Sequence, residues 1–184
     1  MSKVFLSGSR KISRLSDEVR ARLKNMISNN LEILIGDANG ADKAMQTFLF
    51  HVAYPKVTVF CSGGYCRNNI GRWASQLIDV EPNIKGREFY EKKDKAMAAL
   101  ADFGFVLWDG QSVGSIANAF ELVRQGKKVV IYFAPWREFV TIASLDDLGT
   151  LLNRCDPDIQ TDIRRKVELE DFRQPHQASI DFAR

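Results

Sequence analysis

Three short loops combine glycine with hydroxyl, amide or acidic side chains, which are residue types that bind phosphate and sugar groups. They are Gly8-Ser9-Arg10, residues 36–42 (GDANGAD) and residues 109–115 (DGQSVGS). Glycine lets the backbone approach a ligand closely, and arginine can hold a phosphate through two parallel hydrogen bonds. A loop that opens a helix also offers free backbone N–H groups to an anion. Taken alone, the first two loops are equally consistent with ordinary turns, but together the three predict a phosphate-bearing ligand.

The second and third loops suggest separate roles for their side chains. Asp37 or Asp42 is expected to accept hydrogen bonds from ribose hydroxyls, although Asp42 also suits the first turn of a helix, where it complements the dipole. The third loop has no cation, so its N–H and O–H groups would hold the phosphate. It is not a P-loop, and the chain has no G-x-G-x-x-G, which disfavours a classical dinucleotide enzyme. Trp108 is the tryptophan best placed to stack on a base, whereas residues 67–69 (RNN) are expected to form a solvated turn.

The elements that must position these loops are short apolar runs alternating with helical patterns. Strands are predicted at residues 3–7, 31–35, 57–61, 103–108 and 128–133. Apolar strands separated by helices are typical of a parallel sheet covered on both faces. The sequence therefore predicts a Rossmann-like, doubly wound α/β fold with five parallel strands in the order 3-2-1-4-5. In such a fold the three loops meet at the carboxyl edge of the sheet, where ligands bind.

The remaining stretches are less regular. Residues 67–84 show only a short helical pattern near 70–78, whereas 86–100 and 116–124 have clear helical spacing. After residue 135 the alternation stops, and two small helices are predicted at 145–155 and 158–167, followed by a tail. We therefore expect a nucleotide-binding domain over residues 1–135 and a small helical C-terminal extension over 136–184, packed on the same domain.

Composition narrows the classes of function. The 184 residues include 26 Lys and Arg and 23 Asp and Glu, and this near balance of charge disfavours nucleic acid and membranes as partners. Apolar runs are too short to cross a bilayer, and the N-terminus does not read as a signal peptide. Three cysteines without metal-site spacing suggest a reduced, cytoplasmic protein, and no metal or cofactor is expected. Only two histidines are present, and a His-rich centre or a Ser-His-Asp hydrolase would need His51, which ends an apolar helical pattern and is expected to be a packed or solvent-facing residue.

Several motifs in the same order resemble the SLOG superfamily. They are V-F-L-S-G-S-R, I-G-D-A-N-G-A-D-K-A and K-D-K-A-M-A-A-L-A-D-F-G-F-V-L-W-D-G-Q-S-V-G-S, spread over residues 3–133. This group joins DprA-type DNA-processing proteins, LONELY GUY phosphoribohydrolases and YspA/YpsA-like proteins, and the YspA-like branch is the most similar. The resemblance implies a Rossmann-like fold, binding of a nucleotide or nucleotide derivative, and self-association into a homo-oligomer. DNA handling is disfavoured because no stripe of basic and aromatic residues is apparent.

Two departures from the phosphoribohydrolase pattern bear on catalysis. In E-R-K-x-x-M the arginine position holds Lys93, and in G-G-x-G-T-x-x-E the glutamate position holds Asn118. A neutral amide cannot act as a carboxylate base. Glu121, one helical turn on, and Asp94 are the substitute carboxylates. The sequence therefore favours a nucleotide-binding module or sensor, with an enzyme acting on an N-glycosidic bond (phosphoribohydrolase-like or deoxyribosyltransferase-like) as the alternative.

These arguments give two sets of candidate residues. The catalytic candidates are Lys93, Asp94 and Glu121. The residues predicted to bind the ligand are Gly8, Ser9, Arg10, Gly36, Asp37, Gly40, Asp42, Trp108, Asp109, Gly110, Ser112, Gly114, Ser115 and Asn118.

Overall fold

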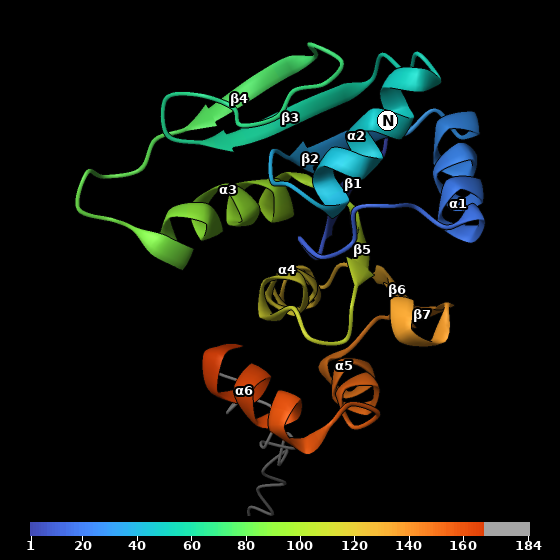
Figure 1. Ribbon diagram of the computed structural model, residues 1–184, viewed down its shortest axis with the longest axis vertical. Coiled ribbons are helices and arrows are strands. Elements are labelled where there is room, and N and C mark those ends of the chain that lie inside the picture. Colours follow the sequence, from blue (N-terminus) through green and yellow to red (C-terminus); the bar gives the residue numbers. More distant parts are fainter. Residues whose placement is uncertain (168–184) are drawn as a thin grey trace, which may run out of the picture.

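Residues 1–167 are described in a computed structural model of the chain (Figure 1). They form one sheet with the strand order β4-β3-β2-β1-β5-β6-β7. The strands are β1 (Lys3–Gly8), β2 (Glu32–Gly36), β3 (Val57–Ser62), β4 (Ala74–Ile78), β5 (Phe103–Trp108), β6 (Val129–Phe133) and β7 (Glu138–Ile142). The helices are α1 (Asp17–Ser28), α2 (Ala41–His51), α3 (Gly86–Leu100), α4 (Val113–Arg124), α5 (Leu145–Leu152) and α6 (Pro157–Val167), with a 3₁₀ turn at Ala134–Trp136.

The five predicted strands are confirmed as the parallel centre of the sheet. They are β3, β2, β1, β5 and β6 in that spatial order, with β1 in the middle. The chain reverses its direction of winding between β1 and β5, so the carboxyl ends of these two strands open onto the ligand-binding edge of the Rossmann-like fold. The three glycine loops follow β1, β2 and β5, and they therefore meet at one edge.

The sheet has seven strands, so the prediction of five was incomplete. β4 lies at residues 74–78, where a short helix was expected, and it pairs in parallel with β3 at the edge of the sheet. Its side chains are mostly exposed, so it lacks the apolar run that marks a buried strand. β7 returns antiparallel to β6 after the 3₁₀ turn. Both additions cover an edge of the predicted sheet.

Alternation along the strands divides the core into two layers. Val4 and Leu6 of β1 pack in the cluster that includes α1 and α2, whereas Phe5 packs in the cluster that includes α3 and α4. Figure 1 shows these helix pairs on opposite faces of the sheet. Because both faces are covered, every residue of β1 from Val4 to Leu6 is fully buried.

The C-terminal helices lie against α4, outside the two main layers. α5 and α6 add Leu148, Leu151, Leu152 and Ile163 to the core cluster of α4. The domain boundary at residue 135 stays a prediction, and residues 168–184 of the predicted extension lie outside the described residues. Within residues 1–167, no helix is both long and apolar enough to cross a bilayer.

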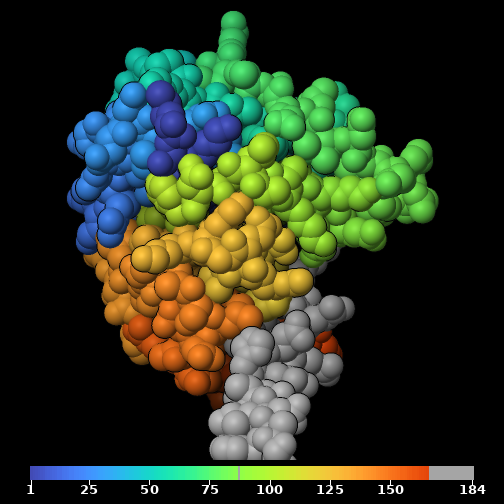
Figure 2. Space-filling view, turned by 180° about the vertical axis from the view of Figure 1, so that it is seen from behind, coloured from blue at the N-terminus to red at the C-terminus, as the bar shows by residue number. Residues whose placement is uncertain are grey.

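Two parts of the surface stand out. α1 borders the segment that leads into β7, where Arg137 pairs with Glu18, and Figure 2 shows these blue and orange segments in contact. Residues 79–85, which link β4 to α3, extend away from the sheet (Figures 1 and 2).

The expectation of three reduced cysteines was wrong for two of them. Cys61 at the end of β3 forms a disulfide with Cys66, with 5.1 Å between the two Cα atoms. The turn between them includes Gly63 with φ of 75°, which lets the chain fold back within a few residues. An odd number of cysteines leaves room for one pair, and Cys155 stays free. The cytoplasmic location stays a prediction.

Candidate functional site

A cavity of about 560 Å³ lies at the carboxyl ends of β1, β2 and β5, between α3 and α4. It contains most of the residues predicted from the sequence. Those lining it are Gly8, Ser9, Arg10, Gly36, Asp42, Lys93, Asp94, Asp109, Ser112, Gly114, Ser115 and Asn118.

The first and third loops are joined by side-chain hydrogen bonds. Ser9 Oγ donates to Asp109 Oδ2 at 2.8 Å, and Asp109 Oδ1 accepts from the backbone N–H groups of Gln111 and Ser112. The Lys11 ammonium donates to the Gln111 amide oxygen at 2.8 Å. Gly8 is required beneath this contact, because a Cβ there would lie 2.6 Å from the Leu107 carbonyl oxygen. The two loops therefore form one wall of the cavity.

The start of α4, which follows directly from the third loop, also lines the cavity. Gly114 is exposed there, and a side chain at this position would meet no atom within 4 Å. Ser115 is buried, and its Oγ donates to Ser112 Oγ at 3.0 Å. Asn118, one turn further on, donates from Nδ2 to Ser7 Oγ at 3.1 Å. The first helical turn has backbone N–H groups without intrahelical partners, so this end of α4 suits an anion.

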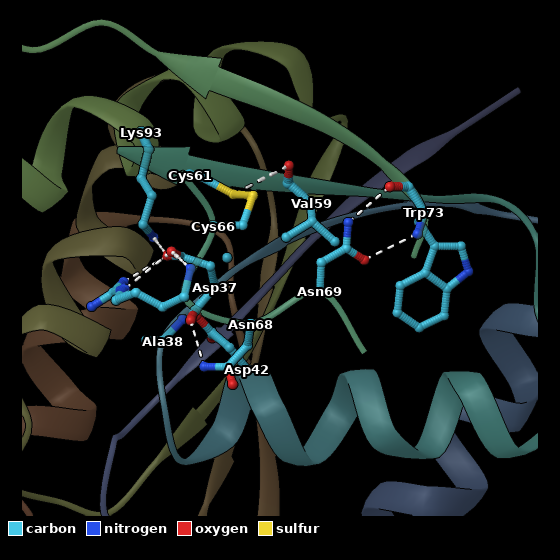
Figure 3. The surroundings of a disulfide bond; sticks show 12 residues. Asp37, Ala38, Asp42, Val59, Cys61, Cys66, Asn68, Asn69, Trp73 and Lys93 are labelled. Atoms are coloured by element: carbon cyan, nitrogen blue, oxygen red, sulfur yellow. Dashed lines mark hydrogen bonds and ion pairs between the residues drawn. A yellow bond between two sulfur atoms is a disulfide. The ribbon is translucent and has the colours of Figure 1, made fainter. Parts of the chain in front are cut away.

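At the end of β2, Asp37 is held by Arg67. The Arg67 guanidinium donates to both carboxylate oxygens, at 2.6 and 3.0 Å, and the Arg67 backbone N–H donates as well. Burial alone would raise the pKa of Asp37, but these hydrogen bonds and the charge of Lys93 bring the pKa below its ordinary value. Figure 3 shows the Lys93 side chain pointing toward Asp37, close to the Cys61–Cys66 disulfide. Asp37, one of the two acids expected to bind ribose hydroxyls, is thus engaged in an ion pair within the protein.

Lys93 extends from α3 into a cage of carboxylates. Its Nζ lies 2.8 Å from Asp94 Oδ1 and 4.0 Å from Asp37 Oδ1. Burial disfavours the ammonium, yet the charges of Asp94 and Asp42 raise the pKa of Lys93 above its ordinary value. Gly36 makes room for this arrangement, since a Cβ there would lie 2.5 Å from Asp42 Oδ2 and 2.8 Å from Lys93 Nζ.

Asp42 is the most perturbed acid of the cage. Burial, with the charges of Asp94 and Asp37, raises its pKa from 3.8 to about 6, while Lys93 and the Ala38 backbone N–H oppose the change. Three carboxylates share two buried or half-buried cations, Lys93 and Arg67. Protonation of Asp42 relieves the excess negative charge, because two like charges in one buried site cannot both ionise freely.

Five predicted residues do not line the cavity. Trp108 is fully buried and stacks on Phe133, with 5.2 Å between ring centroids, so it cannot stack on a ligand base. Gly110 packs toward Phe133, and Gly40 lies against the backbone of Arg10. Asp37 lies behind the cavity wall, in its ion pair with Arg67. Glu121 accepts a hydrogen bond from Gln125 on the exposed side of α4, away from Asn118, so the structure does not place it as a substitute acid.

Three residues that line the cavity and have charged or aromatic side chains were not predicted from the sequence: Lys11, Arg67 and Tyr90. The Arg67 and Arg10 guanidinium carbons lie 4.4 and 5.2 Å from the centre of the Tyr90 ring. Tyr90 belongs to the helical pattern at 86–100 and was not among the predicted site residues. Arg67 belongs to the RNN cluster that was expected to form a solvated turn. It is held at the cavity by its ion pair with Asp37, 30 positions earlier in the sequence.

Comparison with known proteins adds information on the fold. No known family model and no curated protein matches the chain. A solved structure of DNA processing protein A from Helicobacter pylori superposes with a TM-score of 0.56, covering 91% of this chain and 80% of that one at 18% identity. The two chains share a Rossmann-type fold. This agrees with the fold that the SLOG resemblance implies, while the YspA-like branch stays a prediction.

The structural neighbour corrects one expectation. DNA processing protein A binds single-stranded DNA. The expectation that nucleic acid is disfavoured as a partner of this chain is therefore withdrawn. That expectation rested on a net charge of +3 over the whole chain and on the lack of an apparent stripe of basic and aromatic residues. A total says nothing of how charges are distributed, and exposed cations that lack ion pairs bind phosphate whatever the total is.

Proposed function

We propose that the chain binds a nucleotide, either free or at the end of a single strand, with the phosphate at the start of α4. The observation that carries this proposal is the composition of the cavity. The exposed Gly114 at the N-terminus of α4, Arg10 and Lys11 all line it, and among the described residues neither cation is in an ion pair. The volume of about 560 Å³ suits a small ligand rather than phosphate alone.

The other walls suit the remaining parts of a nucleotide. Ser7, Ser9 and Asn118 offer hydroxyl and amide groups to a sugar. Tyr90 offers an aromatic ring, and aromatic stacking tolerates every base. Binding without bond cleavage is favoured because Asn118 is neutral and Glu121 lies outside the cavity, while Asp94, the other substitute carboxylate, lines the cavity but is paired with Lys93.

Gly114→Asp tests the phosphate position. The new side chain has open space, and an acid in the first turn favours the helix, so the fold should be retained. A like charge about 4 Å from the phosphate costs about 4 kcal/mol at an effective dielectric constant of about 20, so we expect affinity to fall at least about tenfold even with solvent screening.

The assay is calorimetric titration with the nucleoside 5′-monophosphates and with the matching nucleosides. Gly114→Asn is the matched control, because it adds the same volume without the charge and should bind more tightly than Gly114→Asp. Glu121→Gln should bind like the wild type. Equal affinity of Gly114→Asp and wild type, or nucleosides binding as tightly as their monophosphates, would overturn the proposal.

A further inference from the structure

Two more cavities follow the proposed nucleotide pocket, the first sharing Lys11 with the pocket and the second sharing Ser13, Arg14 and Leu15 with the first. The first, of about 320 Å³, is lined by Lys11, Arg14 and their neighbours as far as Val19. The second, of about 590 Å³, lies between residues 13–20 and α2, and it is lined by Arg14, Arg20 and Lys43. Lys11 belongs to the pocket and to the first cavity, while Arg14 belongs to both further cavities. The three spaces therefore follow one another along residues 10–15.

The charges along this path have one sign. Arg10, Lys11, Arg14, Arg20 and Lys43 are all exposed, and among the described residues none of them is in an ion pair. No acidic side chain is among the described residues that line either further cavity. Cations that neutralise no acid of the protein are free to neutralise a ligand, and several in a row match a ligand with repeated negative charges.

The backbone beneath the path is fixed. The Ile12 and Ala41 N–H groups both donate to the Ser9 carbonyl oxygen, at 3.2 and 3.1 Å. Gly40, with φ of 82°, allows the backbone of Arg10 to lie against the start of α2. Arg20 is oriented by its own hydrogen bond, from Nε to the Leu15 carbonyl oxygen at 3.2 Å. A fixed backbone lowers the entropy that binding must overcome.

We propose that residues 10–15, with Arg20 and Lys43, form a phosphate track that leads the backbone of a single-stranded oligonucleotide from the pocket to the groove between α1 and α2. These helices lie on the same face of the sheet (Figure 1). The proposal rests on the proposed function, since it places one nucleotide in the pocket. The track proposal goes beyond the proposed function because it states that the ligand is longer than a mononucleotide and gives the direction in which the strand leaves the pocket.

The test compares ligand length. Affinities are measured by calorimetry for a nucleoside 5′-monophosphate and for 5′-phosphorylated oligonucleotides of two, four and six residues, as DNA and as RNA. We expect the hexanucleotide of at least one sugar type to bind at least about tenfold more tightly than the monophosphate at low salt. The variant Arg14→Glu/Lys43→Glu should lose this gain and keep the monophosphate affinity, because neither residue lines the pocket.

Salt dependence gives a second readout. Each phosphate contact of a single strand contributes about 0.7 to the slope of log affinity against log salt, so the double variant should lower the slope by about 1.4. Lys24→Glu/Lys128→Glu is the matched control: it makes the same change in net charge at two exposed lysines that line none of the three cavities. It should keep most of the gain with length.

The outcomes separate the two proposals. A monophosphate that binds in the pocket, with no gain on lengthening, would overturn the track and leave the pocket standing. Equal losses in the double variant and its control would also overturn the track, because the effect would then follow from net charge alone. Oligonucleotide binding that falls in Arg14→Glu/Lys43→Glu but not in Gly114→Asp would support the track and overturn the pocket as the phosphate site.

Discussion

Replacing Asp42 with asparagine should make the stability of the protein depend less on pH. The Asp42 carboxyl is buried beside Asp94 and Asp37, and its pKa is raised from 3.8 to about 6. In the unfolded chain it titrates near its ordinary value. Between these two values the folded state holds a proton that the unfolded state has released, so stability falls as pH rises. At about 1.4 kcal/mol per pH unit, the total loss is about 3 kcal/mol.

The measurement is the free energy of unfolding in denaturant at pH 4 and pH 7, for wild type and Asp42→Asn. The contribution of Asp42 is mostly present at pH 4 and lost at pH 7, whereas asparagine has no proton to release. The stability of wild type minus that of the variant should therefore decrease by about 2.4 kcal/mol from pH 4 to pH 7. Taking this difference cancels any effect of asparagine on packing. The lowered pKa of Asp37 makes stability increase with pH in both proteins, so its contribution opposes that of Asp42 in the wild type and is largely shared by the variant.

Asp79→Asn, which removes an exposed carboxylate from the segment between β4 and α3, controls for the change in net charge. If the difference between wild type and Asp42→Asn stays constant with pH, or increases with it, then the pKa of Asp42 is not raised in the folded protein. The excess negative charge of the cage would then have to be neutralised elsewhere, and our account of the Lys93 site would be refuted.

Two further predictions concern stability. Arg67→Met leaves the buried Asp37 without its main partner, so we expect unfolding free energy to fall by about 3 kcal/mol, whereas Arg165→Met breaks an exposed pair and should change it by less than about 1 kcal/mol. Gly8→Ala should cost about 2 kcal/mol by overpacking, while Gly114→Ala has open space and should be neutral or stabilising; denaturant titration checks both pairs. Equal effects within either pair would contradict the contacts described.

The strands that could be predicted are those whose burial requires a continuous run of apolar residues in the sequence. Strands such as β1 are covered on both faces, so they read as continuous apolar runs that end at glycine. Because the carboxyl ends of parallel strands share one edge, the three loops could be brought together from the sequence alone. β4 carries no such mark, since ASQLI at an exposed edge has neither a run nor a clear alternation. Only its pairing with β3 makes it a strand.

The missing parts of the site depend on contacts between distant residues. Lys93 was singled out by its motif position, but its role in the carboxylate cage follows from α3 crossing the end of β2. Arg67 is placed by Asp37, and the Cys61–Cys66 disulfide closes the turn just before it. Trp108 was misjudged for the opposite reason. It precedes the third loop in sequence, but alternation along β5 turns its ring into the core.

Although the total charge is nearly balanced, acidic and basic side chains are unevenly distributed within the site, and this bears on how the proposed ligand would be oriented. Deep in the site, Asp37, Asp42 and Asp94 outnumber Lys93 and Arg67, so these two cations are engaged with protein carboxylates. An anion gains little there, because it would compete with acids already in place. Arg10 and Lys11 have no such partners among the described residues: Lys11 donates to Gln111 of the third loop, and Arg10 lies over the Tyr90 ring of α3. In the proposed complex the phosphate would therefore lie beside these unpaired cations, and groups that donate hydrogen bonds, such as sugar hydroxyls, would lie toward the carboxylates.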